Sequence, residues 1–309
     1  MQVTTLTCLM SITLTIFVGP AIGPVLASYL VESRGWRISM WEIAIGAAIS
    51  LVLLLLLPET YAPKIVYRAQ NNSKKDARQN GVNRDIVLTA LKDAFWKPCL
   101  ICFQDPAVAY VNIYTAYLYS CYYTFFDGFP LVYIFRYRWK LSHIGLAFLP
   151  IIVGCGVACL LYILYIMCGK SKSEGRHHET YLKPALLAVW APPIGILIFG
   201  WTAQHNTHWA FGMIGVVIYS AGVFVVLQCL IMYILDSYPK YAASLFAAND
   251  FVRSALAAGA VHFGLPLYLN LGPGKACTVL GSVSVLGIAG MFLLYWKGAE
   301  LRGRSRFTG

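Results

Sequence analysis

Four ionisable side chains inside long apolar runs of this 309-residue sequence are candidates for chemistry. A charge in such a run costs free energy unless it is paired with another charge or has a function. One of them, Asp127, lies just before Pro130 in "YLYSCYYTFFDGFPLVY" (117–133). A carboxylate in a medium of low dielectric can exchange a proton near neutral pH. Asp127 is therefore a candidate for proton exchange or cation recognition. The alternative is a residue that hydrogen-bonds near the headgroups of a membrane.

The other three are Asp250, Arg253 and Glu42. Asp250 and Arg253 are three residues apart, which places them on one face of a helix and predicts an ion pair. The pair is either structural or part of a gating or substrate site. Glu42 lies early in its run, in "SMWEIAIG", where its carboxylate could reach an interface; it stays a weaker candidate.

Tyrosines in "YVNIYTAYLYSCYYTFF" (110–126) recur at helical spacing. Tyr110, Tyr114 and Tyr117 share one side of the predicted helix, and Cys121 follows on the same side. Such a stripe could line a cavity for planar or cationic compounds through stacking and cation–π contacts. It could equally be a packing face with an interfacial aromatic belt.

The composition shows which elements must position these residues. Apolar and aromatic residues make up 59% of the chain and charged residues only 12%, about half of the share in soluble domains. Runs of about 20 apolar residues can cross a bilayer as helices. The sequence therefore predicts an all-α polytopic membrane protein with about eight spans, at residues 4–30, 38–57, 107–135, 144–168, 184–202, 209–235, 242–268 and 275–296.

The basic residues predict the orientation and the division of the chain. Most of the 24 Lys and Arg residues fall on the cytoplasmic side if residues 58–106 are placed there, which also puts the C-terminus in the cytoplasm. Residues 1–57 then hold two spans, 58–106 form a long polar loop, 107–296 hold six spans, and 297–309 form a basic tail. We expect a multi-pass protein of the plasma membrane.

Several other functions are disfavoured by the motifs. We find no phosphate-binding loop for ATP, no catalytic triad or zinc-protease motif, and no pattern of a nucleic-acid-binding domain, so we expect a protein that is not an enzyme and needs no cofactor. Cys99 and Cys102 have no second pair beside them, and His177 and His178 fit a solvated loop, so no metal site is predicted. Asn71 begins a glycosylation sequon, but the predicted topology places it in the cytoplasm.

The stretch "FVGPAIGPVLASYL" (17–30) holds two Gly-Pro pairs inside an apolar run. Gly19 and Gly23 form a G-x-x-x-G pattern that allows close approach of another helix, and Pro20 and Pro24 each remove a helical hydrogen bond. Alone, the pattern could be a kinked packing helix. It closely resembles the antiporter signature in the fifth helix of the major facilitator superfamily drug:proton antiporters.

Further motifs resemble the fungal twelve-span branch of that superfamily in the same order, including "RGWR" (34–37), "LPETYAPKIVYRAQ" (57–70) and "YILDSYPKYAASLFAANDFVRS" (233–254). The resemblance implies helices five to twelve of the major facilitator fold, and we expect an N-terminally truncated sequence. It implies a secondary transporter that exports small organic compounds, such as drugs or fungal secondary metabolites, in exchange for protons. The alternatives are a non-transporting fragment or an obligate partner of another half; a membrane-embedded enzyme is disfavoured.

Overall fold

The computed structural model describes residues 2–58, 65, 104–167, 181–204, 207–239 and 241–303, and these residues are almost entirely helical. Two compact units can be separated, residues 1–29 with 95–309, and residues 30–94. The larger unit contains the first 28 residues of α1 (Gln2–Arg34) and all helices from α5 onwards. The smaller unit contains α2 (Trp36–Leu56), in which no residue is buried.

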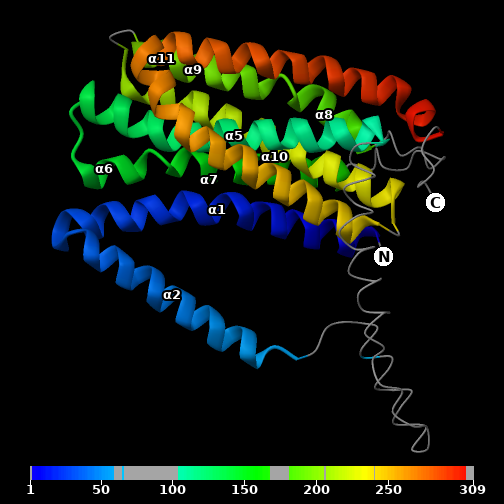
Figure 1. The fold of residues 1–309 in the computed structure, drawn as a ribbon, viewed down its shortest axis with the longest axis horizontal. Helices are drawn as coiled ribbons and strands as arrows, with labels where there is room; N and C mark the ends of the chain where they lie inside the picture. The colour runs from blue at the N-terminus through cyan, green and yellow to red at the C-terminus, as the bar shows by residue number, and fades with distance from the viewer. Residues whose placement is uncertain are drawn as a thin grey trace, which may run out of the picture. The chain divides into compact units, whose positions relative to one another are not determined.

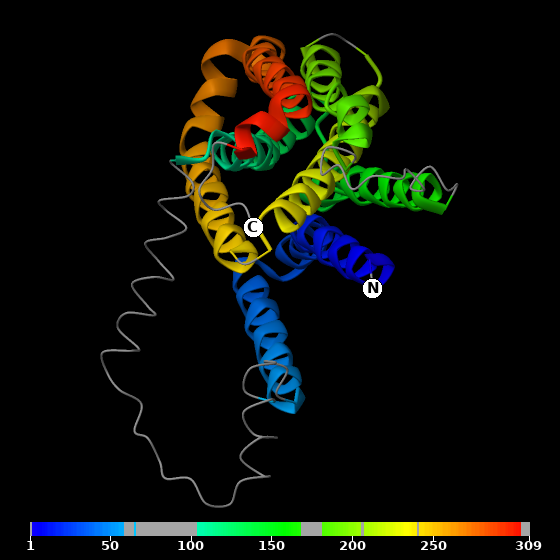
Figure 2. The same cartoon turned by 90° about the vertical axis from the view of Figure 1, so that its right-hand side faces the viewer.

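In the larger unit, α1 is followed by α5 (Pro106–Phe135), α6 (Leu141–Leu146), α7 (Leu149–Met167), α8 (Lys183–Ala188), α9 (Ala191–Gln204), α10 (Trp209–Ser237) and α11 (Ala242–Gly303). These helices run side by side as a bundle in Figure 1, and Figure 2 looks along it. The predicted all-α polytopic architecture is confirmed. Within the described residues, six helices are long and apolar enough to cross a membrane.

Short breaks next to proline divide two of the predicted spans, and a break at glycine separates two others within one long helix. The predicted run 144–168 becomes α6 and α7, with Pro150 in the first turn of α7, and the run 184–202 becomes α8 and α9, with Pro192 in the first turn of α9. In α11, Gly272 has φ 76° and ψ 161°, so this long helix consists of two helical parts joined at that residue. A positive φ favours glycine, which lacks a Cβ.

The helix α5 begins with an N-cap residue followed by proline, and it is rich in tyrosine. Asp105 precedes Pro106, and its carboxylate accepts hydrogen bonds from the backbone amides of Ala107 and Val108, at 2.9 and 3.4 Å. This is the preferred chemistry of a helix N-terminus. The helix carries seven tyrosines, which lower its mean hydropathy, and it is not among the six spans found by hydropathy. The ends of α5 nevertheless lie within one residue of the ends of the predicted span 107–135.

Close packing of small residues holds the bundle together, as is usual for helices in lipid. A Cβ added at Gly195 of α9 would lie 2.5 Å from the carbonyl oxygen of Gly215 of α10, and one added at Gly215 would lie 2.7 Å from the carbonyl oxygen of Gly195. The two backbones therefore meet directly at these residues. The buried core includes large aromatic side chains that are less than 2% exposed, among them Tyr122, Tyr219, Tyr268, Phe129 and Phe224.

Candidate functional site

One side of α5 holds the three tyrosines predicted as cavity candidates, and it is packed against α11. The hydroxyl of Tyr110 donates to the carbonyl oxygen of Gly287 at 2.7 Å, and the hydroxyl of Tyr117 donates to that of Leu280. Tyr114 is 3% exposed and stacks on Tyr110, with ring centroids 5.6 Å apart. These residues, which we call the 110–117 face, form a helix–helix contact. Of the two alternatives left open by the sequence, the packing face describes these contacts with the second part of α11, and a role in lining a cavity stays a prediction.

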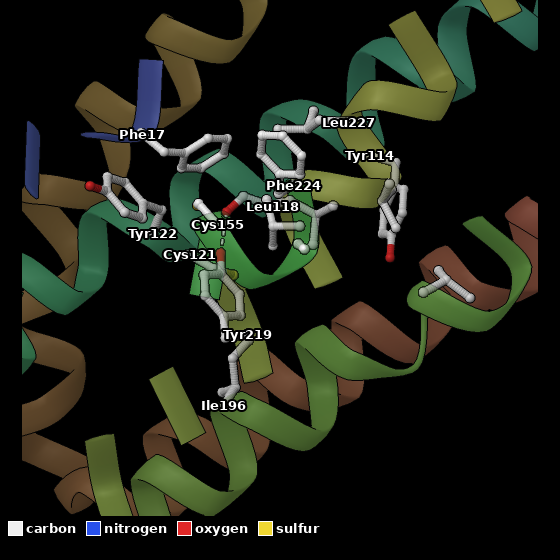
Figure 3. Packing of buried hydrophobic residues seen from close by; sticks show 14 of the residues in the cluster. Phe17, Tyr114, Leu118, Cys121, Tyr122, Cys155, Ile196, Tyr219, Phe224 and Leu227 are labelled. Carbon is white, nitrogen blue, oxygen red and sulfur yellow. Dashed lines mark hydrogen bonds between the residues drawn. The ribbon is translucent and has the colours of Figure 1, made fainter. Parts of the chain in front are cut away.

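A second aromatic surface lies on a different side of α5. It comprises Tyr119, Tyr122, Tyr123 and Phe126, which we call the 119–126 face. The rings of Tyr123 and Phe126 are stacked with centroids 5.5 Å apart, and the hydroxyls of Tyr119 and Tyr123 are 3.3 Å apart. Phe17 of α1 meets Tyr122 edge to face at 5.6 Å, away from Tyr114 (Figure 3). Sequence reasoning missed this face, although its helical spacing was visible in 119–126.

Arg253 of α11 lies against the 119–126 face. Its guanidinium carbon is 4.5 Å from the centre of the Tyr119 ring, within the range of a cation–π contact. One of its nitrogens also forms the predicted ion pair with Asp250. The Arg253 side chain is 11% exposed, whereas that of Asp250 is 64% exposed. A mostly buried cation is therefore held between an aromatic ring and an accessible carboxylate. Whether the pair has a transport role stays a prediction.

A polar cluster joins α5 to α11 close to this pair. The side-chain amide of Asn249 donates to Asn112 at 2.9 Å and to the hydroxyl of Thr115 at 2.8 Å. Asn112 and Thr115 are both buried, at 3% and 1% exposure. Hydrogen bonds of this kind between helices satisfy polar groups that lipid cannot. Sequence reasoning missed the cluster, because Asn112 and Thr115 are far from Asn249 in the chain.

Asp127 lies on α5 beside a glycine of α11. A Cβ added at Gly264 would be 2.5 Å from Oδ2 of Asp127, so the glycine provides the space that the carboxylate occupies. The Oδ2 atom is buried and accepts no hydrogen bond from a described residue. A buried oxygen of this kind has a capacity for proton binding that the structure leaves unused. Its role in proton exchange stays a prediction.

A further carboxylate, which sequence reasoning missed, fixes the start of α5. Asp105 is 1% exposed, and besides capping the helix it accepts a hydrogen bond from the hydroxyl of Tyr238, at the end of α10. Its contacts are thus those of a structural residue. The Asp-Pro pair at 105–106 was the signal that could have identified it, since an acidic residue before proline is typical of a helix start.

The antiporter-like stretch of α1 is helical through both Pro20 and Pro24. A Cβ at Gly19 or Gly23 would meet nothing within 4 Å among the described residues, so their predicted close approach to another helix stays a prediction. The close contact that the structure does contain is made by a glycine of α6. A Cβ at Gly145 would lie 2.7 Å from the carbonyl oxygen of Pro24 and 2.2 Å from the hydroxyl of Ser28.

The remaining sequence candidates lie on α2 or outside the described residues. Glu42 lies on α2, in the unit formed by residues 30–94, and is partly exposed. Asn71, Cys99, Cys102, His177 and His178 lie outside the described residues. Among the described residues, no three His, Cys, Asp or Glu side chains are grouped so that they could hold a metal ion.

Known proteins resemble this chain over most of its length. Residues 11–262 match the Major Facilitator Superfamily. The MFS-type transporter pyvG of Aspergillus violaceofuscus is 36% identical over 94% of this chain and 56% of its own length. Fluconazole resistance protein 1 of Saccharomyces cerevisiae and the cycloheximide resistance protein of Candida maltosa are each 31% identical, over 94% of this chain and 56% and 57% of their own lengths.

The chain therefore spans about half the length of the curated relatives it matches. The arrangement of apolar helices, the match to residues 11–262 and the fungal relatives agree with the resemblance found in the sequence motifs. This chain belongs to the Major Facilitator Superfamily.

Proposed function

We propose that these helices belong to a secondary transporter that exports small organic compounds in exchange for protons. Membership of the Major Facilitator Superfamily supports membrane transport. The relatives named for resistance to fluconazole and to cycloheximide support small organic compounds as the substrate class. Because the chain spans about half of these relatives, the proposal concerns the complete transporter to which such helices contribute.

The observation that carries the proposal is the 119–126 face with Arg253 and Asp250. Stacked rings offer flat apolar surface to a planar compound, while an accessible carboxylate beside a tyrosine can attract a cationic group. The same face contacts α1 through Phe17, so a change in the position of α1 would alter the surface offered to a substrate. Alternating access in transporters works by such movements of one bundle against another.

Asp127 is the group that we assign to proton coupling. Its buried, unpaired Oδ2 atom beside Gly264 can bind a proton in one state and lose it in another. Asp250 with Arg253 is the second candidate, in which protonation of the carboxylate would free the guanidinium. Glu42 is the third and lies on α2.

The proposed setting follows the positive-inside rule. Residues 58–106 form a cytoplasmic loop between a two-span segment, residues 1–57, and a six-span segment, residues 107–296. The basic tail at 297–309 is cytoplasmic, and the protein is located in the plasma membrane.

The test is drug accumulation in yeast cells that lack their own exporters. The chain is expressed alone, and also joined to the first four helices of a longer relative. If the protein exports these compounds, cells with at least the joined form should accumulate less fluconazole or cycloheximide. A protonophore, which removes the proton gradient, should restore the accumulation. Asp127→Asn in the joined form is the matched control for coupling. The proposal is wrong if the joined form reaches the membrane and lowers the accumulation of neither compound.

A further inference from the structure

An open groove of about 480 Å³ lies among α7, α8 and α10, away from the 119–126 face. Its size falls in the range of about 300–1,000 Å³ that is typical of binding sites for small molecules. Its walls are almost wholly apolar, and they include the following residues: Tyr162, Tyr165, Lys183, Leu187, Ala188 and Val225.

The surface around this groove is apolar and exposed. On α7, Leu160 and Leu164 are 64% and 55% exposed, and on α8 the side chain of Leu187 is 81% exposed. In a membrane protein, exposed leucines on the outside of a bundle contact acyl chains. Whatever fills the groove must therefore enter from the bilayer, which favours an acyl chain over a water-soluble compound.

The groove also has one charged end. Lys183 is the first residue of α8 and is exposed, and the hydroxyl-bearing rings of Tyr162 and Tyr165 come from the last two turns of α7. Lysine and tyrosine at the end of a span are typical of the headgroup level. Among the described residues that line the groove, Lys183 is the only charged one. A negative headgroup would complement it.

We propose that this groove, which we call the α7–α8 groove, binds one anionic glycerophospholipid. An acyl chain lies between α7 and α8 over Ala188 and Val225, and the phosphate-bearing headgroup contacts the ammonium group of Lys183. The predicted orientation puts this end of the helices in the cytoplasmic leaflet, where anionic lipids are concentrated. The inference rests on the membrane setting given under the proposed function and is independent of the substrate and of proton coupling.

The test is lipid retention by the purified full chain. The protein is reconstituted in an equal mixture of palmitoyl-oleoyl phosphatidylserine and palmitoyl-oleoyl phosphatidylcholine, extracted in mild detergent, and weighed by native mass spectrometry. A single lysine at the membrane surface favours an anionic lipid by about fivefold. We therefore expect one retained phosphatidylserine and a preference of about that size over phosphatidylcholine.

Two variants, each with a control, test the charge of Lys183 and the shape of the groove separately. Lys183→Gln is expected to remove the preference for phosphatidylserine, and Lys297→Gln, at an exposed lysine of α11 outside the groove, is expected to keep it. Ala188→Phe fills the groove and is expected to reduce retention of both lipids. Leu160→Phe adds the same ring to α7 beside the groove and is expected to leave retention unchanged.

The inference is overturned if the wild-type chain retains the two lipids equally, or if Lys183→Gln keeps the full preference. Competition by millimolar inorganic phosphate that removes the preference would also overturn it, because a free anion rather than a lipid would then be the occupant. If Ala188→Phe does not fold, the comparison of Lys183→Gln with Lys297→Gln still decides the question.

Discussion

The two aromatic sides of α5 use the same residue type in different ways. On the 110–117 face, two tyrosine hydroxyls donate to carbonyl oxygens of α11, and Gly287 provides room for the ring of Tyr114. On the 119–126 face, the tyrosines contact one another, a phenylalanine of α1 and a mostly buried arginine. Each face also has one buried tyrosine hydroxyl without a hydrogen-bond partner among the described residues, Tyr114 on the first face and Tyr122 on the second. One side therefore holds two helices together, and the other surrounds a cation and is the side that we propose for contact with substrate.

This difference gives a criterion for membrane helices rich in tyrosine. A tyrosine whose hydroxyl is satisfied by the backbone of the next helix contributes to stability, and its removal should leave selectivity unchanged. A tyrosine whose ring lies beside a charge is a candidate for contact with substrate. The number of tyrosines on a helix does not separate the two cases, because both occur on α5.

The largest expected effect comes from filling the space on the 110–117 face. A Cβ at Gly287 would lie 1.9 Å from Cε2 of Tyr114, which is held in a buried position. Gly287→Ala should therefore force α5 and α11 apart and lower the free energy of unfolding by about 3 kcal/mol, the upper end of overpacking costs. The midpoint of unfolding in detergent measures this.

The matched control for that variant is Gly156→Ala on α7, where a Cβ meets nothing within 4 Å. This substitution should be neutral or slightly stabilising, since alanine is the better helix former. Equal loss of stability in both variants would show that α5 and α11 are not packed through Gly287.

The next effect concerns proton coupling at Asp127. One pH unit changes the proton concentration tenfold, which is worth about 1.4 kcal/mol of driving force per proton. Export by a transporter carrying these helices should therefore change by up to about tenfold per pH unit, and Asp127→Asn should make it independent of pH while the protein stays folded. The rate of efflux from loaded vesicles at several external pH values provides the measurement.

Glu42→Gln and Asp250→Asn are measured in parallel with Asp127→Asn. If the pH dependence survives in Asp127→Asn and disappears in one of the others, that other carboxylate is the proton-coupling group. The 119–126 face would then be distinct from the proton site, or linked to it through Asp250 and Arg253.

Much of this architecture could be predicted from the sequence. The membrane-spanning helices follow from the lengths of apolar runs in the sequence. The breaks next to Pro150, Pro192 and Gly272 follow from the backbone properties of proline and glycine at those positions. The pair of Asp250 and Arg253 was predicted because both residues lie on the same helix. Each of these features depends on residues that are neighbours in the chain.

The features that were missed depend on which helices meet. The role of Tyr110 and Tyr117 stayed open between a cavity and a packing face, because helical spacing defines a face but not its neighbour, which here is the second part of α11. Asn249 reaches Asn112 across 137 positions of sequence. Similarly, the close approach of Gly145 of α6 to the backbone of α1 could not be read from the sequence, since Gly145 is far in the chain from the residues of α1 that it approaches.

A smaller effect is expected from the contact between Tyr119 and Arg253. Tyr119→Leu removes the cation–π contact and should cost about 1 kcal/mol of unfolding free energy, whereas Tyr119→Phe keeps the ring and should retain most of it. Combination of Tyr119→Leu with Arg253→Met in a double-mutant cycle measures the coupling between the two side chains. A coupling free energy near zero would mean that the Tyr119 ring shields the guanidinium of Arg253 from solvent without attracting it.

The smallest effect is expected on the 110–117 face, from the loss of one hydroxyl. Tyr110→Phe keeps the stack on Tyr114 but removes the hydrogen bond to Gly287, and hydrogen bonds between membrane helices contribute about 0.6 kcal/mol on average. The midpoint of unfolding in detergent should fall slightly, and the relative export of fluconazole and cycloheximide should not change. Tyr119→Leu should change that ratio, because its ring belongs to the face proposed to contact substrate. A change of selectivity in Tyr110→Phe equal to that in Tyr119→Leu would show that both sides of α5 act on the substrate, and the criterion drawn from their hydroxyl contacts would fail.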